Sequence, residues 1–299
     1  MVITKLQGGL GNQMFQYAAA KSLLHAEEYI YLDHAFLEIN HVDTKNFTAR
    51  VYELHIFRNL KASKAHFWQI CLFKSQNIFF KLLRHILKSS IKEYSQIENE
   101  YILFADPSQK IRYIYLDGYF QSEKYFKNWQ KDIISDFSFP LLDPINEKLK
   151  KQIASTTNAV SVHIRRGDYL KSKHVFETHG VLPSTYYNKA LNLLKAKYHS
   201  LTLFIFSDDI DWAKENLKAD HISLVFINNN QSKDNWKDMA LMSTCKHHII
   251  ANSSFSWWGA WLSKNKGDVC APRNWFNPVK VNFNIQDFIP DSWIIINND

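Results

Sequence analysis

The sequence predicts an α/β protein with two domains, each built on a mainly parallel sheet. Three observations support this. Residues 2–33 have the pattern of a strand, a glycine loop, a helix and a second strand, and residues 158–262 alternate apolar strands with amphipathic helices. The segment FPLLDP at 139–144 separates these two regions. We therefore expect an N-terminal domain over 1–150 and a C-terminal domain over 151–299, with a C-terminal tail that packs back on the first domain.

The first domain opens with a short unit that is typical of parallel sheets. Residues 2–6 (VITKL) predict a strand, and the glycine-rich GGLGNQ at 8–13 ends it. Alanines and apolar residues at helical spacing predict a helix over 13–25, and EYIYLD at 28–33 predicts the next strand.

Residues 54–92 form a basic amphipathic stretch, which we expect to be a helical insertion of two helices. The stretch contains eight Lys or Arg and no Asp or Glu, with apolar groups interleaved. One interpretation is a helical face whose cations are solvated. The other is docking on an anionic membrane, where each surface Lys or Arg adds about 1 kcal/mol.

The second domain shows clearer alternation. Strands are predicted over 158–164, 201–206, 222–227 and 248–251, and helices over 183–199, 211–217, 234–245 and 254–262. Polar groups follow the carboxyl ends of several strands, where open parallel sheets bind their ligands. Two such Rossmann-like domains that face one cleft form the architecture called GT-B.

Composition narrows the class of protein. Hydrophobic residues make up 46% of the 299 residues, and the net charge of +7 suits an anionic partner. Three widely spaced cysteines match neither a disulfide framework nor a zinc site. The N-terminus begins with a strand-like segment, and no apolar run approaches the ~18–20 residues that cross a bilayer. We expect a cytoplasmic protein, soluble or peripheral on the inner face of the plasma membrane. Its basic residues match no nucleic-acid-binding pattern.

Two adjacent arginines follow the strand over 158–164, in the segment HIRRGDY at 163–169. Guanidinium groups bind phosphate oxygens in a bidentate fork and stay charged, so an arginine here can neutralise a pyrophosphate leaving group without a metal. The competing interpretation is that Arg165 and Arg166 form structural pairs with aspartates near a turn.

Three other segments could contact a nucleotide. In GGLGNQ, Gly9 and Gly11 would let the backbone approach a ligand at a helix N-terminus, although a plain tight turn explains the same residues. Asn252, Ser253 and Ser254 open the last predicted helix and could hold a phosphate or serve as an ordinary N-cap. Asp238, on the preceding helix, could accept hydrogen bonds from the guanine edge or lie on a solvated face.

The pair Asp208–Asp209 follows the strand over 201–206. It could bind ribose hydroxyls, cap the next helix, or hold a metal through paired carboxylates. Helix capping is the default for this position. Because the aspartates are adjacent instead of spaced as Asp-x-Asp, no metal site is predicted.

Taken together, these segments resemble the bacterial α1,2-fucosyltransferases of glycosyltransferase family 11. The HIRRGDY and SFSWWG segments, in this order, are the most specific. Six segments spread over nearly the whole chain carry the resemblance: LQGGLGNQMFQY (6–17), YEL (52–54), DGYFQS (117–122), HIRRGDY (163–169), FSDD (206–209) and NSSFSWWG (252–259).

The resemblance implies a metal-independent GT-B enzyme without cofactor. It would transfer L-fucose from GDP-β-L-fucose, with inversion, to the 2-hydroxyl of a terminal galactose in an O-antigen or capsule glycan, either free or lipid-linked. The alternative is a fucosyl or other GDP-sugar transferase with a different linkage. A noncatalytic glycan lectin would have no use for the paired arginines.

The resemblance also implies residue roles. By analogy with related α1,6- and protein O-fucosyltransferases, Arg165 would hold the β-phosphate, with Arg166 and Asp208 in the same donor site. His163 and Asp238 would contact guanine, Ser253 or Ser254 would contact phosphate, and Asn252 would belong to the same donor site. Asn12 would lie in the cleft near the β-phosphate and the acceptor. The acceptor side would be formed by Tyr52, Glu53, Tyr119 and Gln121.

The general base is left open. The α1,6 relatives carry a proposed basic carboxylate ten residues after the histidine of this motif, and this chain has Lys173 there. Glu177 and Asp168 are equal candidates. A weak base or deprotonation assisted by the phosphate is the remaining alternative.

Overall fold

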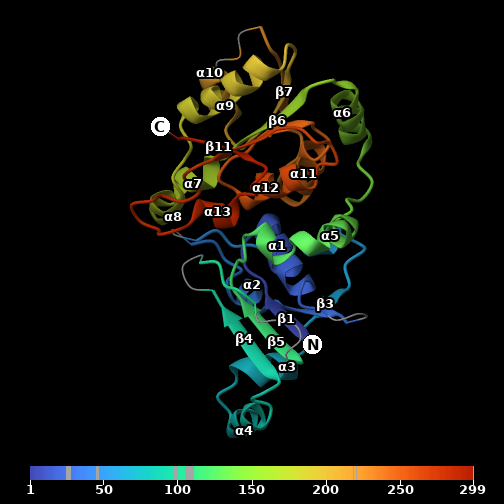
Figure 1. Cartoon of the computed structure of the whole chain (residues 1–299), viewed down its shortest axis with the longest axis vertical. Coiled ribbons are helices and arrows are strands. Elements are labelled where there is room, and N and C mark those ends of the chain that lie inside the picture. The colour runs from blue at the N-terminus through green and yellow to red at the C-terminus, as the bar shows by residue number, and fades with distance from the viewer. Residues whose placement is uncertain are drawn as a thin grey trace. The chain divides into compact units, whose positions relative to one another are not determined.

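The computed structural model describes residues 1–24, 28–44, 47–96, 100–104, 111–217, 219 and 221–298. The chain forms two compact units (Figure 1). The first comprises Met1–Asp43 and Ala49–Pro140, and the second comprises Leu141–Asp299 with the short segment Thr44–Thr48. The boundary between the two units follows Pro140 and lies inside the FPLLDP segment, ten residues before the expected boundary at 150.

The first unit is built on a five-stranded sheet in the order β3-β2-β1-β5-β4, with every pair parallel. Its strands are β1 (Val2–Lys5), β2 (Ile30–Asp33), β3 (Ala62–Lys64), β4 (Ile91–Ser95) and β5 (Tyr113–Asp117). Its helices are α1 (Leu10–Lys21), α2 (Ala35–Ile39), α3 (Phe67–Lys74), α4 (Ile78–Ile86) and α5 (Gln130–Asp136). The strand–loop–helix–strand opening predicted from residues 2–33 is therefore confirmed.

The basic stretch contains two helices, α3 and α4, as predicted, but it is not an insertion beside the sheet. Strands β3 and β4 flank the helices, and these two strands are the opposite edges of the sheet. The connection through α3 and α4 therefore crosses the whole sheet. Leu72, Phe73 and Tyr115 join a buried cluster there, because α3 packs directly on the sheet face.

The second unit is built on a six-stranded sheet in the order β11-β10-β9-β6-β7-β8, again with every pair parallel. Its strands are β6 (Ala159–Ile164), β7 (Thr202–Ser207), β8 (Ser223–Ile227), β9 (His247–Ile249), β10 (Val269–Pro272) and β11 (Ile294–Ile296). Its helices are α6 (Pro144–Ser155), α7 (Gly167–Lys171), α8 (Lys173–His179), α9 (Ser184–Lys197), α10 (Ile210–Asn216), α11 (Trp236–Met242), α12 (Ser254–Trp261) and α13 (Ile285–Phe288).

All six residues of β6 are buried, because helices cover both faces of this sheet. Val160 and Val162 share a core cluster with α9. Ala159 on the same strand, together with Phe204 on β7, shares a second cluster with α6 and α11. Successive side chains of a strand alternate between faces, so His163 lies on the α11 face with Ala159. The C-terminal segment supplies β11 to this sheet.

The prediction of an α/β chain with two parallel sheets is confirmed. Within the described residues, no helix has the length and apolar character needed to cross a membrane.

Candidate functional site

The two arginines lie just beyond the carboxyl end of β6, and two aspartates beyond β7 hold them. Arg166 is the more firmly fixed: its Nε donates to Asp209 at 3.1 Å, and its guanidinium lies 4.3 Å from the ring centre of Trp212. Arg165 makes a longer ion pair, 3.3 Å from NH1 to Asp208 Oδ2. The Arg165 side chain is 28% exposed against 17% for Arg166. The geometry therefore favours Arg165 for contact with an anionic ligand and gives Arg166 a structural role.

The two aspartates have different local functions. Asp209 is the N-cap of α10, because its carboxylate accepts from the backbone N–H of Trp212 at 3.1 Å. Asp208 accepts from the backbone N–H of Arg166 at 2.9 Å and so fixes the turn that carries both arginines. Among the described side chains, no group of three or more His, Cys, Asp or Glu is arranged to hold a metal ion.

Gly167 permits this arrangement of aspartate and arginine. A Cβ at Gly167 would lie 2.9 Å from Asp208 Oδ2, which is closer than real Cβ contacts allow. Any other residue would push the carboxylate away from the Arg166 backbone. The glycine in HIRRGDY is thus explained by packing against the partner of both arginines.

The α11 face of the sheet carries the expected guanine-reading residues. His163 is buried near the end of β6, and its ring centre lies 5.8 Å from that of Phe255 on α12. Asp238 on α11 is half-buried and accepts from Asn230 Nδ2 at 2.7 Å. Burial raises the pKa of Asp238 to about 7, although the Asn230 hydrogen bond partly opposes the shift. Because burial removes water from the Asp238 carboxylate, hydrogen-bond donors of a ligand would stabilise its charged form.

The start of α12 combines a cap with a packing residue. Ser253 caps the helix, since its Oγ accepts from the backbone N–H of Phe255 at 3.3 Å, and Ser254 is the partly exposed first helical residue. Asn252 is buried, and its amide donates to the carbonyls of His179 at 2.9 Å and Trp275 at 3.3 Å. The amide group of Asn252 is therefore engaged within the protein, and its assignment to the donor site stays a prediction.

The SFSWWG segment has a packing role that the sequence analysis did not assign. Trp257 and Trp258 are buried, and Trp257 Nε1 donates to the carbonyl of Phe288 at 2.8 Å. A Cβ at Gly259 would lie 2.9 Å from Met242 Cβ on α11. The glycine lets α12 approach α11 closely, and this sets Asp238 relative to the start of α12.

The two candidate bases remain candidates. Glu177 lies on α8, is 43% exposed, and forms an ion pair with Lys173 at 3.8 Å. Lys173, which stands at the position of the carboxylate expected from the α1,6-fucosyltransferases, is thus the ion-pair partner of Glu177. Asp168 falls within α7, but its side chain lies outside the described part of the chain.

In the first unit, the glycine loop leads into α1 with a strained turn. Gly8 has φ of +76°, and a Cβ there would meet Asn12 Nδ2 at 2.3 Å, so only glycine fits. Gly9 is the N-cap of α1, and Gly11 lies buried in its first turn. Asn12 Oδ1 accepts from Gln121 Nε2 at 2.9 Å, which joins two segments of the predicted site within this unit.

Gln13 is a site residue that the sequence analysis missed. Its buried side chain donates to the carbonyls of Gly8 at 2.9 Å and Val51 at 2.7 Å, and it accepts from the backbone N–H of Glu53 at 2.9 Å. This single side chain holds the glycine loop beside the Tyr52–Glu53 segment. The available signal in the sequence was a Gln directly after the glycine loop, at the start of a predicted helix.

Two tyrosines assigned to the acceptor are partly buried. The Tyr52 ring lies 4.5 Å from the His34 ring, between centroids, and burial raises the Tyr52 pKa. Burial also raises the pKa of Tyr119 and lowers the pKa of His34, so both tyrosine hydroxyls and the imidazole are neutral near pH 7. Neutral aromatic groups of this kind suit the apolar faces and hydroxyls of a sugar.

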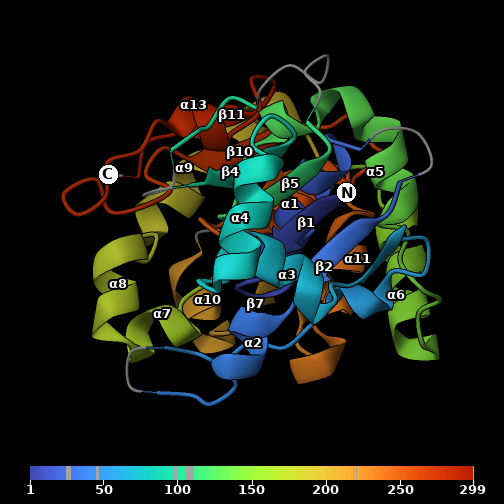
Figure 2. The same cartoon turned by 90° about the horizontal axis from the view of Figure 1, so that it is seen from below.

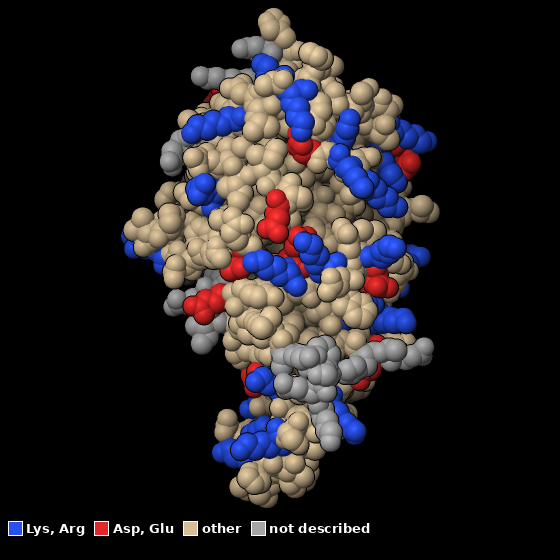
Figure 3. Space-filling view, viewed as in Figure 1, with Lys and Arg blue, Asp and Glu red and all other residues tan. Residues whose placement is uncertain are grey.

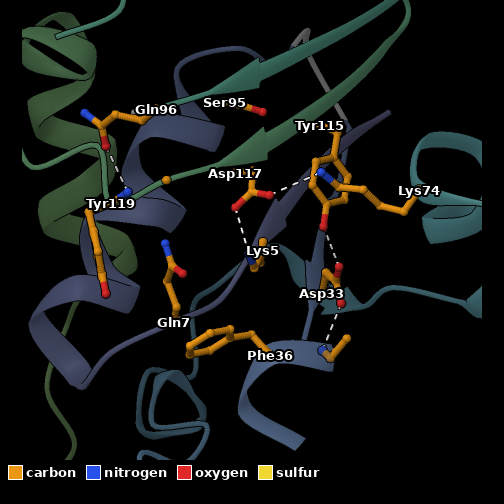
Figure 4. Close-up of polar contacts among 12 residues, drawn as sticks. Lys5, Gln7, Asp33, Phe36, Lys74, Ser95, Gln96, Tyr115, Asp117 and Tyr119 are labelled. Carbon is orange, nitrogen blue, oxygen red and sulfur yellow. Dashed lines mark hydrogen bonds and ion pairs between the residues drawn. The ribbon is translucent and has the colours of Figure 1, made fainter. Parts of the chain in front are cut away.

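A second polar group was missed at the carboxyl edge of the first sheet. Figure 4 shows Lys5 and Lys74 both directed at Asp117, with nitrogen–oxygen distances of 2.9 and 3.2 Å. Tyr115 donates to Asp33 at 2.6 Å. Lys5, Asp33 and Asp117 end the neighbouring strands β1, β2 and β5, so a polar group at this edge was foreseeable from the parallel arrangement. Lys74, at the end of α3, could not be placed there from the sequence. The two ammonium groups lower the pKa of Asp117 against the raising effect of burial.

Comparison with known proteins identifies the class. Residues 1–297 match the family model for glycosyl transferase family 11, and the chain belongs to this family. It is 35% identical to the O-antigen biosynthesis glycosyltransferase WbnK of Escherichia coli, over 97% of this chain and 98% of that protein. It is 33% identical to an Escherichia coli alpha-1,2-colitosyltransferase, over 99% of both chains. A galactoside alpha-(1,2)-fucosyltransferase 1 of Saimiri boliviensis boliviensis is 28% identical over 70% of this chain and 58% of its own length.

Proposed function

We propose that the chain transfers L-fucose from GDP-β-L-fucose, with inversion, to the 2-hydroxyl of a terminal galactose during O-antigen or capsule synthesis. Membership of glycosyl transferase family 11 supports the reaction class. The alpha-1,2 relatives support the linkage, and the O-antigen relative supports the acceptor class.

One observation carries the proposal for this chain: the partly exposed Arg165 at the carboxyl end of β6, held in place by Asp208. An arginine oriented before the ligand arrives loses little side-chain entropy when it binds a diphosphate. The fixed neighbour Arg166 adds positive charge to the same turn. In this proposal Arg165 binds the β-phosphate, and Ser254 with the N-terminus of α12 adds further donors.

The mechanism follows from where charge develops. The acceptor hydroxyl attacks C1 of fucose from the face opposite GDP, the bond from C1 to the diphosphate oxygen breaks, and negative charge grows on the departing GDP. Arg165 stabilises that charge in the transition state more than in the ground state, which is what lowers the barrier. The acceptor proton passes to Glu177, to Asp168 or to the departing phosphate.

We assign the acceptor to the first unit. Tyr52, Glu53, Tyr119 and Gln121 supply aromatic surface and hydrogen-bonding groups, and Gln121 is already linked to Asn12. Asn12 in turn is proposed to lie near the β-phosphate when both substrates are bound.

A second donor is favoured by a specific observation. The colitosyltransferase aligns with 99% of this chain at 33% identity. Colitose lacks one hydroxyl that fucose carries, at position 3, so the two donors differ by one hydrogen-bonding group. GDP-colitose is therefore the alternative donor in this proposal.

The deciding experiment is incubation of the full chain with GDP-fucose or GDP-colitose and a panel of β-galactosides, with NMR analysis of the product linkage. We expect transfer from GDP-fucose to the galactose 2-hydroxyl. Transfer from GDP-colitose alone would overturn the donor assignment. Transfer to another hydroxyl would overturn the linkage. GDP release without a glycoside product in every reaction would refute the transferase proposal as stated.

The proposal includes no metal. Addition of EDTA should leave the transfer rate unchanged, and a rate that falls with EDTA and recovers with Mg²⁺ or Mn²⁺ would contradict it. UDP-galactose and GDP-mannose serve as control donors that should give no product.

A further inference from the structure

Helix α4 in the first unit has one wide apolar side, of which the protein covers only a part. On the inner face, Leu83 packs with neighbouring Leu87 against the buried cluster formed by α3 and the sheet. On the outer face, Ile78, Leu82 and Ile86 are 69%, 58% and 75% exposed, and Phe79 beside them is 62% exposed. Figures 1 and 2 both show α4 next to α3, and Figure 1 shows it on the side of α3 away from the sheet.

An outer face of this kind is unusual for a surface helix. Such a helix ordinarily carries charged and polar residues on the side away from the core. Four large apolar side chains clustered on one exposed helical face instead indicate a surface that another body covers. Phe67 and Trp68, in the first turn of α3, are also 81% and 57% exposed.

The charges around this face have one sign. Lys81 and Lys88 are exposed on α4 and just after it, and the whole stretch 54–92 contains no Asp or Glu. Figure 3 shows Lys and Arg atoms among uncharged atoms over this end of the first unit. An apolar band with Lys81 and Lys88 beside it complements an anionic bilayer surface, with acyl chains below and negative headgroups above.

Arg84 has a different role from the lysines. Its guanidinium donates to the carbonyls of Leu72 at 3.1 Å, Phe73 at 3.4 Å and Ser75 at 2.8 Å, which are carbonyls at the end of α3. Arg84 therefore locks α4 against α3 and stabilises the end of α3. Lys81 and Lys88 remain exposed beside the apolar residues of α4.

We propose that the outer face of α4 docks the protein on an anionic membrane, with Ile78, Phe79, Leu82 and Ile86 inserted and Lys81 and Lys88 at the headgroups. A nine-residue helix is about 14 Å long, roughly half of the ~30 Å hydrocarbon core, so it lies in the interface and does not span it. Docking would bring a transferase to acceptors that are attached to lipid.

The test is flotation of the full chain with vesicles of phosphatidylglycerol mixed with phosphatidylcholine, and with phosphatidylcholine alone. The protein should float with the anionic vesicles only. Because a cation near an anionic surface strengthens binding about fivefold, the double variant Lys81→Glu/Lys88→Glu should bind at least about 25-fold more weakly. The variant Leu82→Gln/Ile86→Gln should lose the part of the binding that resists high salt.

The matched control is Lys148→Glu/Lys151→Glu on α6, which changes the net charge equally at two exposed positions. It should retain vesicle binding, and thermal melting should show that all variants are folded. The inference is overturned if the wild type does not bind anionic vesicles, if it binds neutral vesicles equally, or if the control loses as much binding as Lys81→Glu/Lys88→Glu. A stable dimer that Leu82→Gln disrupts, without vesicle binding, would assign the face to a second copy. No sugar donor is present, so this outcome is independent of the proposed function.

Discussion

Lowering the pH from 8 to 6 should weaken GDP binding about tenfold through Asp238 alone. Its pKa in the free protein is about 7, so the ionised fraction falls from about 0.9 to about 0.1 over this range. In our assignment only the carboxylate form accepts hydrogen bonds from guanine N1–H and its 2-amino group. The apparent affinity therefore follows the ionised fraction, and most of the change falls between pH 7 and pH 6.

The sign of this effect differs from the effect on stability. In the folded protein the pKa of Asp238 lies above the ordinary carboxyl value near 4. The protonated group therefore stabilises the free fold at low pH, and this stabilisation is lost as the pH rises through about 7. The free protein should thus lose stability over the range in which GDP affinity rises. Asp238→Asn should remove both dependences, and should bind GDP more weakly than the wild type at pH 8.

Isothermal titration calorimetry of GDP at several pH values measures the effect. The terminal phosphate of a nucleotide also titrates near pH 6, so UDP serves as a control that shares the diphosphate and lacks guanine. The assignment predicts that the difference in pH dependence between wild type and Asp238→Asn is about tenfold for GDP and absent for UDP. Equal pH profiles of the two proteins with GDP would refute the reasoning.

Three further predictions follow from the contacts described above. Arg165→Ala should lower kcat about 100- to 1000-fold and leave the melting temperature within a few degrees, because it removes a donor to the diphosphate; a retained rate in a steady-state assay would contradict this. Arg166→Ala should destabilise the fold by about 1–2 kcal/mol in urea titration, because it loses the Asp209 pair and the Trp212 contact. Gln13→Ala should lower the free energy of unfolding by about 2–4 kcal/mol, because three partly buried backbone groups lose their hydrogen-bond partner. An unchanged midpoint in urea denaturation would show that water replaces the amide.

The strands with strong local patterns were predictable. VITKL at β1 and the buried run at β7 carry their own apolar signal, and the glycine loop between β1 and α1 is visible in the residues. The short edge strands were not predictable. Ala62–Lys64 has three residues and is largely exposed, so only its pairing with β2 makes it a strand. The pattern of residues 54–92 therefore predicted a helical insertion that included β3.

The site was predictable as a set of segments but not as a division of roles. The motif alone did not distinguish Arg165 from Arg166, and only the family resemblance assigned the β-phosphate to Arg165. Their difference depends on Asp209 and Trp212, which lie more than forty residues further along the chain. The same holds for Asn252, whose amide partners are the carbonyl of His179 at the end of α8 and the carbonyl of Trp275 in the segment after β10. Local spacing cannot reveal such partners, because tertiary packing chooses them.

The contact of Gly259 with Met242 has a consequence for nucleotide selectivity. Even one methyl group at position 259 would force α12 away from α11, and the two helices carry Ser254 and Asp238. Such a substitution touches no ligand, yet it would change the spacing between the residue that we assign to phosphate and the residue that we assign to guanine. Its kinetic effect would look like a loss of discrimination between guanine and other bases, although its origin would be an overfilled helix interface.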